Sequence, residues 1–145
     1  MTDSKHQLVL AASIGIACVL AAGCSSSTKK IEQESSNLKP LMVEYGKYIG
    51  QHRGQPPANE AEFKAFVKLP AQGVKDPDAL FISSRDKQPY VVLYGRVSGP
   101  PGPAGQPVIA YEQQGVDGRR FVASTLGAIE EVDEKKFREL VPSAK

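Results

Sequence analysis

The feature that most constrains this chain is an uncharged run of fifteen residues near its N-terminus, from Leu8 to Ala22. The run follows a short start that carries Lys5. It is short for a membrane span, because a helix needs about 20 apolar residues to cross a bilayer. An apolar run of roughly 7–15 residues behind a positive start is typical of a secretory signal peptide, which is removed from the mature protein. The sequence therefore predicts that residues 1–23 take no part in the fold.

Small residues lead from this run directly into a cysteine, in the order Leu20, Ala21, Ala22, Gly23, Cys24. This order resembles the lipobox of bacterial lipoproteins, with alanine at the position where leucine is usual. The resemblance implies cleavage before Cys24 and acylation of its sulfur and new amino group. Two or three acyl chains on one residue would hold the mature chain on membrane lipid. The alternatives are an uncleaved signal anchor and a secretory peptide cut after Gly23.

The lipobox resemblance also implies a location and a domain plan. The chain would lie outside the cytoplasm, anchored in the cell envelope, and Ser25 favours the outer membrane because it is not the Asp that often retains such proteins at the inner membrane. Residues 25–36 contain one apolar residue in twelve and are predicted to be a tether. The predicted plan is a signal peptide at 1–23, a lipid anchor and tether at 24–36, and one domain at 37–145.

The first part of this domain has the spacing of helices. A helix is expected from an N-cap at Asn37 to a stop near Gly54, which can adopt the left-handed conformation that ends helices. A second, short helix is expected after Asn59, because Glu62 completes a capping-box pattern, and it should end before Pro70.

From residue 80 on, the pattern changes to short apolar runs of strand type. The runs are 80–82, 90–94, 108–111, 121–124 and 128–132. Asp117-Gly118 and Leu126-Gly127 predict turns, so the last three runs should form an antiparallel meander. Asp133 is expected to cap a closing helix that docks on the sheet through Phe137. The predicted class is α+β, with N-terminal helices, an antiparallel sheet of three to five strands and a short C-terminal helix.

Composition argues against several classes of function. The 18 Lys and Arg nearly balance the 16 Asp and Glu and alternate with them, so no nucleic-acid surface is expected. His52 is the one histidine after processing, so we expect no metal, no cofactor and no Ser-His-Asp site. The acidic run from Glu130 to Glu139 is predicted to be a solvated face, although two carboxylates there could in principle hydrolyse a glycan. No catalytic residue is therefore expected.

Four residues are candidates for an interaction. Arg85 and Asp86 precede a buried strand, and an arginine there could grip a carboxylate of a partner. The plainer interpretation is a turn nucleated by Asp86, with Arg85 paired to an acidic neighbour in the chain. Tyr90 and Tyr94 belong to the following strand and would mark an interaction surface if the sheet exposes an apolar patch, and core packing otherwise. The proline-rich stretch 99–107 is expected to be an exposed connector.

The order of the C-terminal half suggests a relationship. Asp86 to Tyr90 entering a sheet, a glycine-rich turn after strand 107–112 and a closing helix together are similar to the C-terminal sheet of type II secretion pseudopilins. The chain lacks a prepilin peptidase site, so the resemblance implies the fold alone. The leading hypothesis is a non-enzymatic, lipid-anchored envelope protein that binds or braces an envelope partner. A pseudopilin-like accessory and an envelope glycan-binding or hydrolase domain are the alternatives.

Overall fold

The computed structural model describes residues 36–144, so Cys24, the predicted signal and the predicted tether apart from its last residue, Ser36, lie outside the described residues. Three 3-10 turns, Pro70–Gln72, Ala79–Phe81 and Pro103–Gly105, join the main elements. The helices and strands are, in chain order, α2 (Leu38–Gln51), α3 (Glu60–Val67), β1 (Tyr90–Val92), β2 (Val108–Glu112), β3 (Arg119–Ser124), β4 (Ile129–Asp133) and α4 (Glu134–Leu140).

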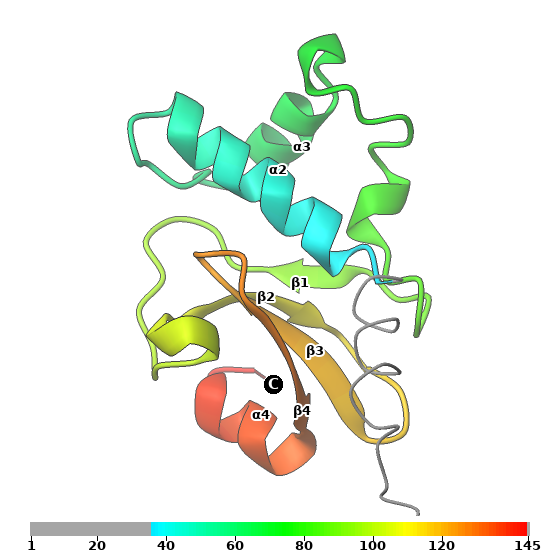
Figure 1. Cartoon of the computed structure of the whole chain (residues 1–145), viewed down its shortest axis with the longest axis vertical. Helices are drawn as coiled ribbons and strands as arrows, with labels where there is room; N and C mark the ends of the chain where they lie inside the picture. Colours follow the sequence, from blue (N-terminus) through cyan, green and yellow to red (C-terminus); the bar gives the residue numbers. More distant parts are fainter. Residues whose placement is uncertain (1–35, 145) are drawn as a thin grey trace, which may run out of the picture.

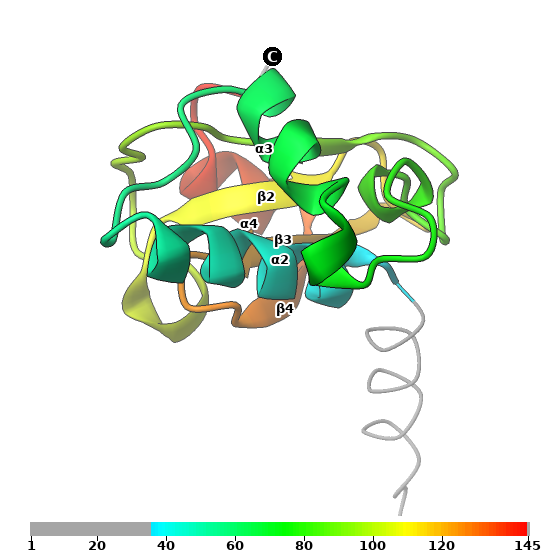
Figure 2. The ribbon, with the colours of Figure 1, turned by 90° about the horizontal axis from the view of Figure 1, so that it is seen from above.

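The four strands form one antiparallel sheet in the order β1-β2-β3-β4. Helices α2 and α3 lie on one face of this sheet and α4 lies on the other (Figures 1 and 2). The predicted α+β arrangement is therefore confirmed, with four strands. No helix between residues 36 and 144 has the length and apolar character needed to cross a bilayer.

Each face of the sheet has its own apolar core. Alternate residues of a strand point to opposite faces, so Phe121 belongs to the helix-side core with α2 and α3, whereas Val122 belongs to the α4-side core. Edge-to-face rings build the helix-side core, with centroids 5.3 Å apart for Tyr45 and Phe63 and 5.6 Å apart for Phe63 and Phe81. In the α4-side core, Phe137 packs edge-on against a tyrosine of β2. This docking is the one expected for the closing helix.

The helix caps show which local predictions the structure confirms. The Asn59 side chain accepts from the Glu62 N–H at 2.9 Å, and a Glu62 oxygen accepts from the Ala58 N–H, which is a reciprocal capping box. Asp133 likewise caps α4 by accepting from the Lys136 N–H. Asn37 stands at the N-cap position of α2 as predicted, but its side chain makes no capping hydrogen bond to the helix.

Two further predictions are corrected. The run 80–82 is not a strand, since Ala79–Phe81 is a 3-10 turn and only Ile82 forms an isolated bridge, with Pro89. The stretch 99–107 is not a fully exposed connector, because Pro103 is buried and begins a 3-10 turn. In both segments apolar side chains are buried through contacts with distant parts of the chain, and these contacts override the local pattern.

The β2–β3 hairpin follows the predicted turn chemistry. Asp117 and Gly118 both have positive φ, of 52° and 71°, and Val116 and Arg119 exchange two backbone hydrogen bonds across them. Gly115, beside this turn, has φ 76°, and a Cβ placed on it would lie 2.2 Å from the Arg119 carbonyl oxygen. The hairpin therefore requires glycine at 115 for space as well as for conformation.

The difference between Gly115 and Gly118 can be tested by the effect of alanine at each position on stability. Gly118→Ala meets no atom within 4 Å and is expected to lower the unfolding free energy by about 1–2 kcal/mol, the cost of the left-handed conformation. Gly115→Ala adds a backbone clash and should lower it by about 3 kcal/mol or more. Urea unfolding of the two variants measures the difference. Equal losses would contradict a steric requirement at 115.

Candidate functional site

Residues 83–88, which we call the pre-β1 loop, are organised by one serine. The Ser83 N–H donates to the Gln88 carbonyl at 2.9 Å, and the Lys87 N–H donates back to the Ser83 carbonyl at 3.1 Å. The Ser83 hydroxyl oxygen also accepts from the backbone N–H groups of Arg85 and Asp86. The loop is therefore a closed turn that delivers the chain into β1.

Asp86 ties this loop to the β2–β3 hairpin. One carboxylate oxygen accepts from the Gln88 N–H at 3.0 Å, and the other accepts from the N–H groups of Gln114 at 3.2 Å and Gly115 at 2.7 Å. Partial burial raises the pKa of Asp86, but these backbone donors outweigh it and hold the pKa below its usual value. The predicted turn nucleated by Asp86 is present.

Arg85 lies over the helix-side face of the sheet between two glutamates. Its guanidinium is 3.4 Å from a Glu112 oxygen and 3.2 Å from a Glu131 oxygen, and it stacks 4.2 Å from the centroid of the Phe121 ring. Arg119 pairs with the second Glu131 oxygen at 3.1 Å. Arg85 therefore has the acidic neighbours that the plainer interpretation predicts, and it is mostly buried.

Glu112 is the buried end of this ion-pair chain. It is fully buried on β2, where it accepts from the Ser83 hydroxyl at 3.0 Å and from the Phe121 N–H at 2.9 Å. Burial raises its pKa, and the Phe121 N–H and Arg85 offset that rise only in part. Nothing in the sequence marked Glu112 as special, because a strand-end glutamate is ordinarily solvated.

The two candidate tyrosines differ in exposure. Tyr90 is 7% exposed and belongs to the helix-side core, where burial raises its pKa to about 12. Tyr94 is partly buried, and burial, followed by the nearby Glu60, raises its pKa. The Tyr45 hydroxyl donates to the Leu93 carbonyl at 3.3 Å and so fixes this end of β1 to α2. Both tyrosines pack in or against the helix-side core, and both line a groove.

That groove, which we call the edge groove, runs along β1 between the strand, α3 and the turn 79–81, and encloses about 710 Å³. Its wall is partly aromatic, from Phe81 and Tyr94. The charged residues that line it are Glu60, Lys64, Asp76 and Asp78. The lining therefore carries three carboxylates and one ammonium group.

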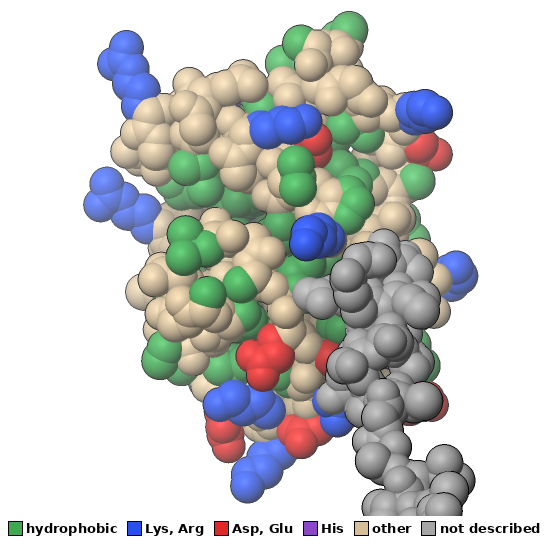
Figure 3. All heavy atoms as spheres, viewed as in Figure 1, with side chains coloured by type: hydrophobic (Ala, Val, Ile, Leu, Met, Phe, Trp, Pro, Cys, Tyr) green, Lys and Arg blue, Asp and Glu red, His purple; other side chains and the backbone are tan. Residues whose placement is uncertain are grey.

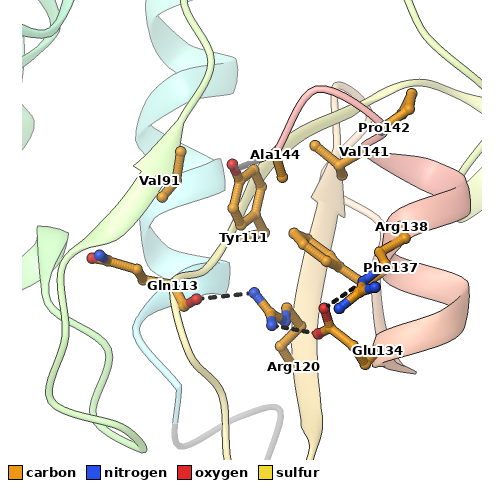
Figure 4. Close-up of a pocket in the computed structure, with 10 residues that line it drawn as sticks. All are labelled: Val91, Tyr111, Gln113, Arg120, Glu134, Phe137, Arg138, Val141, Pro142 and Ala144. Atoms are coloured by element: carbon orange, nitrogen blue, oxygen red, sulfur yellow. Dashed lines mark hydrogen bonds and ion pairs between the residues drawn. The ribbon is translucent and has the colours of Figure 1, made fainter.

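A second groove, which we call the α4 groove, lies on the other face of the sheet and encloses about 580 Å³ (Figure 4). Tyr111 and Phe137 face each other in it, with ring centroids 5.0 Å apart. Val91 lies at its far side, on β1, and also lines the edge groove. The two grooves thus flank the same edge strand.

An arginine holds the charged part of the α4 groove. Arg120 stacks 4.0 Å from the Phe137 ring centroid and donates to the Gln113 carbonyl at 2.9 Å and to a Glu134 oxygen at 2.6 Å (Figure 4). The other Glu134 oxygen accepts from Arg138 at 3.0 Å. These residues come from β3, from α4 and from the position that follows β2, so no local spacing in the sequence could have grouped them.

The acidic C-terminal run divides between the two faces. Glu131 belongs to the ion-pair chain with Arg85, whereas Glu134 lies in the α4 groove, and Glu139 pairs with Lys136 at the surface. Charged side chains of both signs gather at the end of the molecule formed by α4 (Figure 3). This run is therefore largely an ion-paired surface.

His52 ends α2 and stacks on Tyr48, with ring centroids 3.8 Å apart. Within residues 36–144 no group of three His, Cys, Asp or Glu side chains is placed to hold a metal ion.

No protein-family model, curated protein or solved structure matches the chain. Its function is therefore inferred from the residues and the geometry described above.

Asp86 provides a test of the pre-β1 loop. Asp86→Asn removes the charge that three backbone N–H groups share, and we expect the unfolding free energy at pH 7 to fall by about 2 kcal/mol. The folded-state pKa of Asp86 is lowered. The wild type therefore has this stability above about pH 4 and loses it as the pH falls through the folded-state pKa, so the difference should shrink in acid. Urea unfolding at pH 7 and pH 3 measures it.

The matched control is Asp117→Asn in the hairpin that Asp86 contacts, at a position where asparagine readily adopts the left-handed conformation. This control should change the unfolding free energy at pH 7 by less than about 0.5 kcal/mol. A loss in Asp86→Asn that is as large at pH 3 as at pH 7 would show that the carboxylate charge is not what the loop uses.

Proposed function

We propose that the protein is a lipid-anchored protein of the bacterial cell envelope, held by acyl chains on Cys24, whose domain binds a partner protein around β1 and carries out no reaction of its own. The observation that carries the binding role is the position of both grooves beside one edge strand, with Val91 lining each. Grooves of this size accept side chains of a partner.

The start of the fold supports the anchor. Ser36 and Leu38 are buried, and the Asn37 amide donates to the carbonyls of Ala79 and Ile82 at 3.2 Å each. The domain is thus tied down from its first described residue. The twelve residues from 25 to 36 would span about 40 Å if fully extended and about 20 Å as a flexible coil. Acyl chains on Cys24 would keep the domain beside the membrane.

The alternatives have less support. Hydrolysis of a glycan requires two carboxylates that flank one bond at a cleft. Glu131 and Glu134 lie on opposite faces of the sheet, and each is engaged by arginine. A pseudopilin-like role would rest on the resemblance of the sheet alone, which indicates a fold and not an assembly function.

The anchor is tested by intact mass. Protein from the membrane fraction of the producing bacterium should lack residues 1–23 and carry the mass of a diacylglyceryl group, with or without a third acyl chain, on Cys24. Cys24→Ser should lose that mass and retain the signal. Cys18→Ser is the matched control, because this cysteine lies in the discarded run, and it should be processed as the wild type is. A mature chain without acyl mass would refute the anchor.

The binding role is tested by site-specific photo-cross-linking in cells. A photoreactive residue at Val91, between the grooves, is expected to give one discrete cross-linked band with a second protein. The same residue at Lys135, exposed on α4, is the control and should not give that band. Equal cross-linking from the two positions would contradict a binding surface around β1.

A further inference from the structure

We infer that the outer edge of β1 receives an extended segment of a partner protein as an added strand, and that this segment places basic side chains in the edge groove. The inference rests on the proposed binding role and names the kind of partner. It follows from the backbone of β1, from the lining of the groove and from the contrast between the two edges of the sheet.

The backbone of β1 leaves hydrogen-bonding groups free at its outer side. The Leu93 N–H donates to the Ile109 carbonyl at 2.7 Å, and Val92 stands opposite Ala110 in the register. Bonded and non-bonded pairs alternate along antiparallel strands. Because Leu93 is bonded to β2, the N–H and C=O of Val92 point away from β2.

The outer side is closed at the start of β1, open at Val92 and closed again at Gly95, whose N–H donates to the Pro57 carbonyl at 2.8 Å. Ile82 forms a bridge with Pro89, so the chain itself covers that part of the edge. For Val92, no hydrogen bond to a backbone or side chain outside β2 is found among residues 36–144. The edge groove opens at this point. An N–H and C=O that point outward from an edge strand in this way can form hydrogen bonds with an added strand, as in β-strand addition.

The lining of the edge groove indicates the chemistry of the added strand. Glu60 and Asp78 are exposed on one wall, with side chains 60% and 72% accessible, and Asp76 lies beside them. Lys64 pairs with Glu60 at 2.6 Å, and Lys68, which is not part of the lining, pairs with Asp78 at 2.9 Å, so three carboxylates stand against two ammonium groups. A lysine or arginine on the inward face of an added strand would therefore meet net negative charge, and an apolar neighbour would meet Phe81 and Tyr94.

The two edges of the sheet differ in charge, as expected if the β1 edge binds a partner strand and the β4 edge does not. Tyr90 to Tyr94 contain no charged residue, whereas β4 carries exposed Glu130 and Asp133, and such charges protect an edge from pairing. A second copy of this chain fits the β1 edge poorly, because pairing two β1 strands would bring two acidic grooves together. The partner is thus a different chain with basic side chains.

The probe is a synthetic seven-residue peptide in which every second residue, on the side that would face the groove, is lysine or valine. The residues between them are threonine or glutamate. In the control peptide each lysine is replaced by glutamate and each glutamate by lysine. Binding to the full chain in detergent is measured by fluorescence anisotropy. The lysine peptide is expected to bind about tenfold more tightly than its charge-exchanged control. Equal affinities would overturn the basic chemistry of the partner.

Two variants at one position test strand addition itself. Val92→Pro removes the outward N–H, which β2 does not use, and proline is tolerated at such edge positions. Val92→Ala trims the side chain and keeps the N–H. The proline variant should bind the lysine peptide about fivefold or more weakly than the alanine variant, which is the loss of about one hydrogen bond. Equal affinities would overturn strand addition.

A thermal melt reports whether Val92→Pro folds. If it does not, the double variant Glu60→Gln, Asp78→Asn takes its place. This variant should bind the lysine peptide and the control peptide with equal affinity, and a preference for the lysine peptide that persists would overturn the inference.

Light scattering tests whether a second copy of the chain occupies the edge. A dimer that Val92→Pro dissociates would assign the edge to a second copy and overturn the inference of a basic partner. A cross-link at Val91 that Val92→Pro leaves unchanged would preserve the proposed function while refuting strand addition.

Discussion

A carboxylate without solvent contact, Glu112, is the group on which the rest of the structure depends. A buried charge is costly unless hydrogen bonds and an opposite charge compensate it. Here the Ser83 hydroxyl, the Phe121 N–H and the Arg85 guanidinium all converge on one side chain. Two of these groups come from the pre-β1 loop and one comes from β3, so the compensation of a single charge requires the loop to lie against the centre of the sheet. Breaking such a buried pair by removing one partner costs about 3–5 kcal/mol in other proteins.

This arrangement also holds β1 in place. A strand of three residues contributes little by itself, and its neighbours must hold it. Glu112 holds the pre-β1 loop from the β2 side, and Asp86 holds the same loop from the β2–β3 hairpin. At the other end of β1, the Tyr45 hydroxyl meets the Leu93 carbonyl. The outer edge is consequently fixed before any partner arrives, and a pre-ordered edge lowers the entropy cost of binding an extended segment.

The range over which each interaction acts decides what the sequence could predict. The capping box at Asn59, the cap at Asp133 and the Asp117-Gly118 turn involve residues within four positions of one another, and all three are present. The run 80–82 has the composition of a strand but is a turn, because Phe81 packs against Phe63 in the helix-side core. Asn37 looked like a cap for the same local reason, yet its amide bonds to a segment more than forty residues away. The α4 groove was beyond sequence reasoning, because its aromatic pair and its arginine come from three elements.

The position of Asn37 links the proposed anchor to the proposed binding edge. Its amide donates to Ala79 and Ile82, which line the edge groove, and the start of α2 lies beside the start of β1 (Figure 1). In the proposed arrangement the tether therefore joins the domain next to the groove that receives the partner. A tether of twelve residues allows this point to lie at most about 40 Å from the lipid. The segment added to β1 would then belong to a protein that itself presents an extended, basic stretch close to the membrane, because a partner site farther away could not reach the edge while Cys24 stays anchored.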